Sequence, residues 1–333
     1  MTGATPVGSR GRTRALRTLS IAIAIALATV LLFFSLRGIE WRRVWLLVEH
    51  ARPAWLALAL ALSTATLFLR ACRWRVLLSA EASVSVPDVF WATCAGYFGN
   101  NFLPARAGEL VRTYMISAVY RLDLPFVLAT ALCERIADAV TLVAIASIVL
   151  LRLPAQSGAV AKAIPLFAAL ALAGAAAIVI LPLVGPAAVR IIERIPLPHG
   201  LRSRLVAVFE QGLRGLRAFH HLGRLSAFCA FSAAIWILDA VATTIIAKAL
   251  ALSISLPVAF LLLAALGLGS ALPSTPGYVG IYQFVAVTVL TPFGLSRTDA
   301  IAYILLAQAL SYVVIGAWGS VGIARYRRTR RPE

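Results

Sequence analysis

The chain has 333 residues, of which 61% are hydrophobic and 13% are charged. Soluble domains carry about 25% charged residues, and the mean hydropathy of this chain is +0.90, so the composition excludes a soluble protein and indicates a polytopic membrane protein. The net charge of +18 comes from arginines at the ends of apolar runs, a pattern typical of membrane topology signals and of contacts with anionic lipid head groups. We therefore expect membrane lipids, anionic ones in particular, as partners and no nucleic acid.

The apolar runs predict about six full membrane spans of roughly 20 residues each. Residues 1–19 form a basic N-terminal segment, and the first run has no small-residue cleavage site, so we expect a retained span rather than a signal peptide. Segment 70–75 places a tryptophan among arginines at the end of the second run, an arrangement typical of an interfacial anchor. The expected spans are 20–36, 54–69, 124–151, 164–183, 225–250 and 300–323.

Two polar breaks interrupt the apolar sequence, and both have the pattern Leu-Pro-x-x-x-Gly. Proline and glycine so close together break a helix, because one lacks the backbone N–H and the other relaxes the chain. Broken helices are tolerated at membrane depth only where they are buried in protein or line a wet cavity. The expected hinge residues are Pro104, Pro273, Pro276, Gly277 and Gly280.

A short apolar piece lies on each side of each break: 87–103, 108–120, 256–272 and 278–293. Each is shorter than the roughly 20 residues of a span, so each pair predicts a re-entrant or broken helical hairpin. Each half of the chain, 20–155 and 156–324, then has the order span, span, hairpin, span, which predicts an inverted repeat. The fold class is therefore expected to be all-α and polytopic, with two such hairpins besides the full spans.

The positions of the basic segments predict how the spans are oriented across the membrane. Segment 186–224 is rich in arginine and has apolar residues at helical spacing, which predicts an amphipathic helix on the membrane surface. With both termini in the cytoplasm, this segment, segment 70–75 and the tail 325–333 all lie inside, as the positive-inside rule requires. We expect a multi-pass protein of the bacterial cytoplasmic (inner) membrane.

Ionisable residues inside the expected spans predict a polar cavity between the halves. Each such charge costs about 2.5–3.5 kcal/mol near the bilayer centre, so these side chains must face one another or water. The candidate substrate-binding residues are Asn100, Asn101, Arg106, Gly108, Glu109, Arg112, Glu134, Arg135, Asp138, Asp239 and Gln283.

An anionic head group is the ligand that these residues favour. Arg106 and Arg112 would bind it, a phosphate being the best match for guanidinium geometry, and the helix start at Gly108 would add backbone N–H donors. The acids of the third and fifth spans would balance the arginines when no substrate is bound, or respond to protons.

Structural roles stay open beside these functional ones. The charges can form a static interhelical network, Glu109 and Arg112 can form an intrahelical pair, and Asn100 and Asn101 can satisfy backbone groups freed by the break. The downstream break is polar but uncharged, so it has the character of a hinge or gate rather than of an anion site. Gln283, which follows this break, is nevertheless kept among the candidate substrate-binding residues.

No catalytic, metal or cofactor site is expected. The cysteines show no Cys-x-x-Cys spacing, and the histidines lie in or near polar connections. The sequence carries no Ser-His-Asp, zinc or phosphate-loop signature.

Four motifs give the sequence a family resemblance: Arg70-Ala-Cys-Arg-Trp-Arg, Asn101-Phe-Leu-Pro-Ala-Arg-Ala-Gly-Glu-x-x-Arg112, Glu134-Arg135-x-x-Asp138 and Pro273-x-x-Pro-Gly-x-x-Gly280. The chain resembles the flippase-like integral-membrane family, best known as the transmembrane portion of bacterial lysylphosphatidylglycerol synthases. The resemblance implies movement or handling of lipids, including aminoacylated phospholipids and, in other branches, polyprenyl lipids. Many relatives carry an acid near the position of Gln283, so an acid role is not expected there.

The resemblance favours a lipid flippase or lipid transporter that works by alternating access. The synthases attach a soluble aminoacyl-transferase domain after the membrane part, whereas this sequence stops at Glu333, so we expect no aminoacyl-lipid synthesis and no enzyme. One alternative is a membrane-embedded enzyme on polyprenyl-phosphate substrates. Another is an accessory membrane subunit of a separately encoded lipid-modifying enzyme, and a homo-oligomer also stays open.

Overall fold

The computed structural model describes residues 26–102, 107–152, 198–217, 219, 221–270 and 276–329, together with scattered positions between 173 and 195. All regular structure in these residues is helical. After an apolar helix Ala26–Leu36, the chain forms α2 (Trp41–Glu49), α3 (Pro53–Leu78), α4 (Val86–Phe102), α5 (Gly108–Tyr120), α6 (Leu124–Arg152), α8 (His199–Arg217), α9 (Leu222–Ala249), α10 (Leu256–Gly269), η3 (Pro276–Tyr278), α11 (Ile281–Leu290), η4 (Thr291–Phe293) and α12 (Arg297–Thr329).

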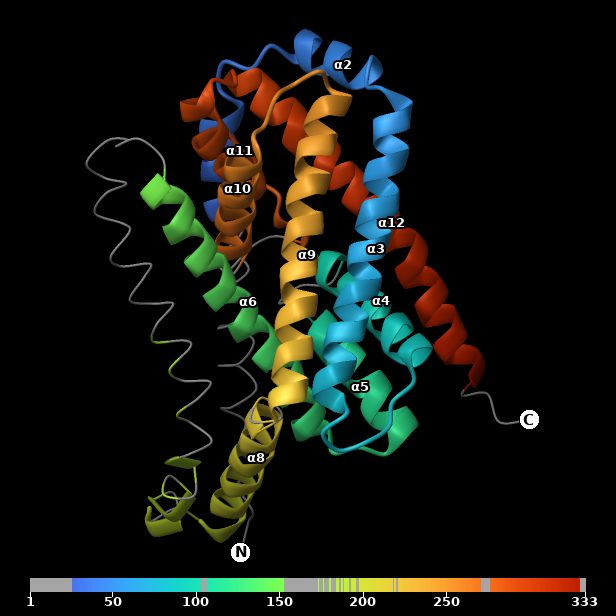
Figure 1. Cartoon of the computed structure of the whole chain (residues 1–333), viewed down its shortest axis with the longest axis vertical. Coiled ribbons are helices and arrows are strands. Elements are labelled where there is room, and N and C mark those ends of the chain that lie inside the picture. The colour runs from blue at the N-terminus through green and yellow to red at the C-terminus, as the bar shows by residue number, and fades with distance from the viewer. Residues whose placement is uncertain are drawn as a thin grey trace, which may run out of the picture.

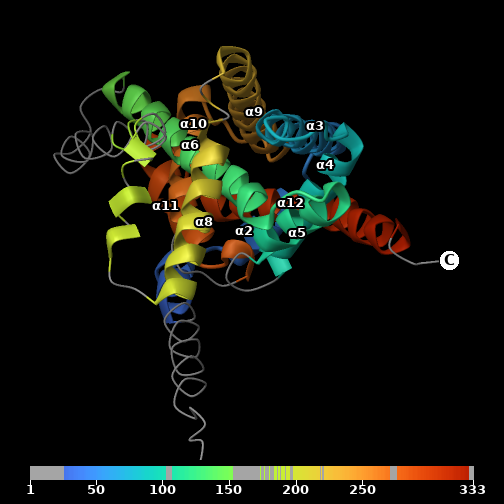
Figure 2. The same ribbon diagram turned by 90° about the horizontal axis from the view of Figure 1, so that it is seen from below.

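Three long apolar helices make the frame of the molecule (Figure 1). α3, α9 and α12 have 26, 28 and 33 residues, and all three are long and apolar enough to cross a membrane. Seen from below, α3 and α9 lie side by side with α4 next to α3 (Figure 2). The expected spans 54–69, 225–250 and 300–323 therefore correspond to long helices, and α3 runs well past the predicted end of its span.

The structure describes the other three expected spans to different extents. The span 124–151 forms α6, a 29-residue helix that carries charged residues in its middle. The first span is described from residue 26 as a shorter apolar helix, and the span 164–183 lies largely outside the described residues. The total of six spans stays a prediction.

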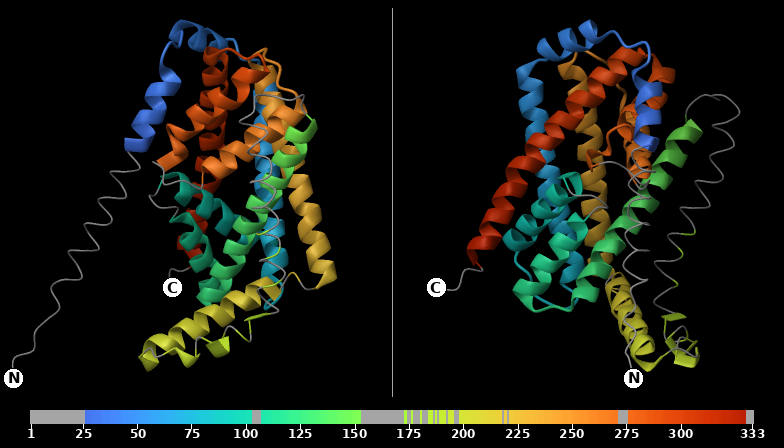
Figure 3. Two further views of the ribbon diagram at one scale, coloured as in Figure 1. Left: turned by 90° about the vertical axis from the view of Figure 1, so that its left-hand side faces the viewer. Right: turned by 180° about the vertical axis from the view of Figure 1, so that it is seen from behind.

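Two pairs of short helices flank the two breaks. α4 packs against α5 and α10 packs against α11, and the four helices have 17, 13, 14 and 10 residues. The first pair lies toward the end of the molecule that holds α8, and the second lies toward the end that holds α2 (Figure 3). This placement is compatible with two opposed hairpins, and the inverted repeat itself stays a prediction.

Gly108 allows the first pair to pack closely. A Cβ atom at this position would lie 1.9 Å from the carbonyl oxygen of Gly96 and 2.5 Å from the amide nitrogen of Asn100. Only a residue without a side chain lets α5 begin against α4 in this way.

Amphipathic helices cover the two ends of the molecule. α2 packs against the start of α12, where Arg43 forms a 3.0 Å ion pair with Asp299, and it leaves Trp41 and Trp45 exposed. α8 packs against α6 at the opposite end (Figure 3), within the segment predicted to form a surface helix.

Two separate apolar cores leave a polar layer between them. One core joins α9, α10, α11 and α12 and includes Ala59 of α3. The other joins α3 to α4, α5 and α6, and includes Trp74 and Leu78. Thr66 and Arg70 of α3 lie between these two stretches, at the level of the site described next.

Candidate functional site

Eight ionisable side chains from α3, α5, α6 and α9 gather in the polar layer. They are four arginines and four carboxylates, each with a partner within 4 Å, so their formal charges cancel: Arg70, Arg73, Arg112, Arg135, Glu109, Glu134, Asp138 and Asp239. Because most of the pairs join different helices, the charges stabilise one another across the fold, as burial in a membrane protein requires.

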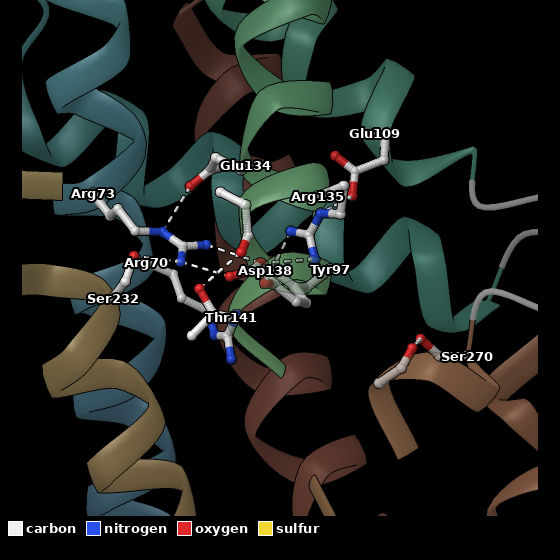
Figure 4. Close-up of polar contacts among 12 residues, drawn as sticks. Arg70, Arg73, Tyr97, Glu109, Glu134, Arg135, Asp138, Thr141, Ser232 and Ser270 are labelled. Carbon is white, nitrogen blue, oxygen red and sulfur yellow. Dashed lines mark hydrogen bonds and ion pairs between the residues drawn. The ribbon is translucent and has the colours of Figure 1, made fainter. Parts of the chain in front are cut away.

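Arg73 is the centre of this network (Figure 4). Its guanidinium donates to both carboxylate oxygens of Asp138 at 2.6 and 3.0 Å, to Glu134 at 3.2 Å and to the hydroxyl of Ser232 at 3.1 Å. Glu134 and Asp138 are four residues apart on one face of α6, so one planar guanidinium reaches both. Arg73 thereby ties α3 to α6 and α9.

The sequence interpretation of segment 70–75 as an interfacial anchor is wrong. Arg73 is 1% exposed and Trp74 is 0% exposed, and the indole N–H of Trp74 donates to Thr130 at 3.1 Å. Arg70 and Arg73 stand inside α3 rather than at its end, because carboxylates on neighbouring helices neutralise them. The acids one turn apart on α6 were the available signal, since two buried carboxylates require a cation.

Arg112 links the first hairpin to the network. Its Nε atom lies 2.7 Å from Glu109 and its Nη1 atom lies 2.9 Å from Glu134, and its guanidinium lies 4.4 Å from the centre of the Trp74 ring. The intrahelical pair considered from the sequence is therefore present. Arg112 and Glu134 are 2% and 1% exposed, so they lie behind the surface that a ligand would meet.

A cavity of about 520 Å³ lies beside the network and is lined by residues of α3, α4, α5, α6, α9, α10, η3, α11 and α12. Cavities of about 300–1,000 Å³ are typical of small-molecule sites. Asn100 and Asn101 reach it from the first break, and Gly277 and Tyr278 reach it from the second. The structure therefore brings the described residues beside the two breaks, at the end of α4 and in η3, together at one polar cavity.

One wall of the cavity is charged, and its side chains retain some exposure. The side chains of Arg70 and Asp239 are 15% and 21% exposed and pair at 2.7 Å. Those of Arg135 and Glu109 are 30% and 16% exposed and pair at 3.3 Å. Arg135 also donates to the hydroxyl of Tyr97 at 3.3 Å. This wall offers guanidinium groups to a phosphate and carboxylates to a cation or hydroxyl, each after release from its partner.

The opposite wall carries hydroxyl and amide groups. Ser270 of this wall faces the network from across the cavity (Figure 4). The rings of Tyr278 and Tyr282 stack with their centres 4.9 Å apart. Further polar lining comes from Gln308, Ser311 and Tyr312. Such groups suit glycerol or sugar hydroxyls, which exchange hydrogen bonds without a charge.

Amide and phenol groups hold the second break in place. The carbonyl oxygen of Gly277 accepts from Gln308 at 3.0 Å and from Tyr312 at 3.0 Å. Gln308 in turn accepts from Gln283 at 2.6 Å, and the side-chain oxygen of Gln283 accepts from the backbone N–H of Gly280 at 2.7 Å. Gln283 is 3% exposed and does not line the cavity, so both of its polar groups serve the break.

The candidate residues thus separate into three groups. Those that line the cavity are Asn100, Asn101, Glu109, Arg135, Asp138, Asp239 and Gly277. Those that lie around it are Gly108, Arg112, Glu134, Pro276, Gly280 and Gln283. Pro104, Arg106 and Pro273 lie outside the described residues.

Several site residues were missed from the sequence. Arg70 and Tyr97 line the cavity, and so do Gln308 and Tyr312. Isolated polar residues in apolar helices were the available signal, because each one inside a membrane requires a partner.

The sequence profile of the lysylphosphatidylglycerol synthase TM region matches residues 21–319. The chain belongs to this family. The family membership agrees with the resemblance found in the motifs and with a multi-pass helical membrane protein.

The chain is also similar to the glycosyltransferase AglD of Haloferax volcanii, with 26% identity over 352 aligned residues. The alignment covers 93% of this chain and 54% of that protein, so the chain spans about half the length of this relative. The expectation that the protein is not an enzyme is therefore corrected, because a relative over nearly the whole chain is a named glycosyltransferase. Family and relative together indicate a membrane protein that handles lipids or lipid-linked substrates.

Proposed function

We propose that this protein binds the phosphate-bearing head group of a membrane lipid in the polar cavity and moves it across the bacterial cytoplasmic membrane. The observation that carries the proposal is the cavity itself, where a charged wall and a hydroxyl-rich wall meet among apolar helices. Residues beside both helix breaks line this cavity, and paired broken helices mark the substrate site in transporters built from repeats.

Arg70 and Arg135 are the groups that would take the phosphate. They are the most exposed arginines of the network, and each is held by a single carboxylate contact shorter than 3.5 Å. A phosphate that displaces those carboxylates leaves them free to accept from ammonium or hydroxyl groups of the same head group. Arg73 and Arg112 each contact two carboxylates, so they would keep the helices together while the exposed pairs exchange partners.

Alternating access would use the contact between the two breaks. α4 packs against η3, and the Phe102 ring lies 6.2 Å from the Tyr312 ring. A movement of α4 and α5 relative to α10, α11 and α12 would separate these rings on one side of the site and close the other side. This rocking is the usual movement of a transporter that holds its site between two halves.

Lipid movement in proteoliposomes tests the proposal. Dithionite bleaches a fluorescent phosphatidylglycerol only in the outer leaflet, so transport appears as additional bleaching. We expect Arg70→Gln to slow movement about tenfold or more, the loss of one charge-assisted hydrogen bond. The double variant R70Q/D239N removes the cation without stranding its acid and should be equally slow. Arg43→Gln changes an ion pair far from the cavity and is the matched control, and wild-type movement by both cavity variants would refute the proposal.

A second candidate function is glycosyl transfer with a lipid-linked substrate. The similarity to the glycosyltransferase AglD favours it, and the stacked rings of Tyr278 and Tyr282 on the cavity wall suit a sugar face. Incubation of the purified protein with a radiolabelled polyprenyl-phosphate sugar and an acceptor distinguishes the two functions. Sugar transfer that Tyr282→Leu abolishes would favour the enzyme, whereas movement of unmodified lipid favours the transporter.

A further inference from the structure

An apolar groove lies directly beside the polar cavity, between α6, α9 and α10. It has a volume of about 750 Å³, and its lining is almost wholly hydrocarbon: Val140, Ile145, Val149, Phe228, Ala233 and Phe260 are representative. Ile148, Ile237 and Leu256 at its edge are exposed. The groove therefore opens on a face of α6 and α9 that the acyl chains of a bilayer would contact.

Trp236 of α9 is the residue that lines both the cavity and the groove. It packs in one cluster with Leu142, Ala146 and Ala264, and the guanidinium of Arg70 lies 5.4 Å from its ring centre on the cavity side. Leu142 also lines the cavity, so an indole and a leucine side chain stand between the charged wall and the groove.

The indole N–H of Trp236 is buried without an acceptor among the described residues. The side chain is only 8% exposed, and a buried donor left unpaired carries a penalty that a native fold ordinarily avoids. By contrast, Trp74, which is also buried, donates its N–H to Thr130. The missing acceptor and the place of the ring between two cavities point to a group supplied from outside the chain.

We propose that the groove holds the hydrocarbon chain of the same lipid whose head group enters the polar cavity, and that Trp236 is the movable partition between them. The inference rests on the proposed lipid function and adds the route by which the lipid enters. When the ring turns aside, a phosphate or ester oxygen of the lipid accepts the indole N–H while Arg70 meets the phosphate. The groove has no charged side chain in its lining, so it does not suit a charged head group. A lipid whose head group lies in the cavity needs an apolar path for its hydrocarbon chain, and the groove provides one.

Photo-cross-linking with a phosphatidylglycerol that has a diazirine in its acyl chain shows directly which residues contact the acyl chain. After irradiation in proteoliposomes, we expect cross-links on residues 137–149 of α6 and 225–237 of α9. Ala233→Trp fills the groove and should abolish these cross-links. Ala65→Trp is the matched control, because Ala65 is an exposed alanine in another depression of the surface, between α3, α4 and α12. Cross-links that lie elsewhere, or that persist in A233W, would overturn the groove as the site of the chain.

Binding of a soluble short-chain lipid separates this inference from the proposed function. We expect A233W to bind dihexanoyl phosphatidylglycerol as the parent does but to lose the long-chain lipid, whereas R70Q should lose both. Trp236→Phe keeps a ring and removes the N–H, and it should weaken long-chain binding about fivefold, one neutral hydrogen bond. If W236F binds the long-chain lipid as the parent protein does, the indole N–H of Trp236 does not donate a hydrogen bond to the lipid. Absence of binding in the parent protein would refute the lipid function itself, and the inference with it.

Discussion

Replacement of Arg73 by methionine tests whether the ionic network holds the helices together. The substitution keeps an unbranched side chain but removes four hydrogen bonds to Glu134, Asp138 and Ser232. Glu134 keeps Arg112 at 2.9 Å, whereas Asp138 is left with Arg135 at 3.7 Å. A buried charge that loses its partner destabilises a protein by about 3–5 kcal/mol, a large part of a total stability of roughly 5–15 kcal/mol.

The free energy of unfolding, measured by dodecyl sulfate titration in mixed micelles, gives this loss directly. The double variant R73M/D138N also removes the stranded carboxylate and should recover about 1–3 kcal/mol, the cost of an unsatisfied buried group. Arg43→Gln is the control, because the Arg43 side chain is 52% exposed and an exposed pair contributes about 0–1 kcal/mol. If R73M lowers the free energy of unfolding no more than R43Q does, the ionic network is not what joins α3 to α6.

Two further predictions concern packing and access. Gly108→Ala should destabilise the protein by at least about 1–3 kcal/mol, the usual cost of overpacking, because its Cβ would overlap the carbonyl oxygen of Gly96; a thermal shift assay measures this, and an unchanged midpoint would contradict the close packing of α4 on α5. Cys229, which is exposed in the apolar groove, should react with a membrane-permeable maleimide much faster than the buried Cys94 and Cys133; equal rates by mass spectrometry would contradict an open groove.

Local pattern was enough to find the two breaks and six of the eight network residues, all but Arg70 and Arg73. Glu134 and Asp138 stand one turn apart in an apolar run, so a helical reading places both on one buried face. The partner of these acids was not predictable in the same way, because Arg73 lies 61 and 65 residues away in the sequence. Hydropathy alone ended the second span at Leu69, whereas α3 continues to Leu78. α3 can continue past Arg70 and Arg73 because carboxylates of other helices pair with them. The local sequence around α3 does not reveal such distant partners.

The second break could also be predicted only in part from the sequence. Gly277 and Gly280 were found by residue type, and both adopt positive φ angles of 72° and 91°, which glycine tolerates best. The groups that fix the break are Gln308 and Tyr312 of α12, and Gln283 joins them. These side chains looked like isolated polar residues in the sequence, so their joint role appears only once α11 and α12 are placed together.

The cancellation of charge in the network has a consequence for membrane voltage. Four guanidinium groups and four carboxylates that move together carry no net charge through the electric field. The field then does no net work on these groups of the empty protein and acts on the cargo instead, at about 2.3 kcal/mol per elementary charge per 100 mV. A lipid with one negative charge would be driven toward the electrically positive side, whereas a zwitterionic lipid would equilibrate regardless of the potential.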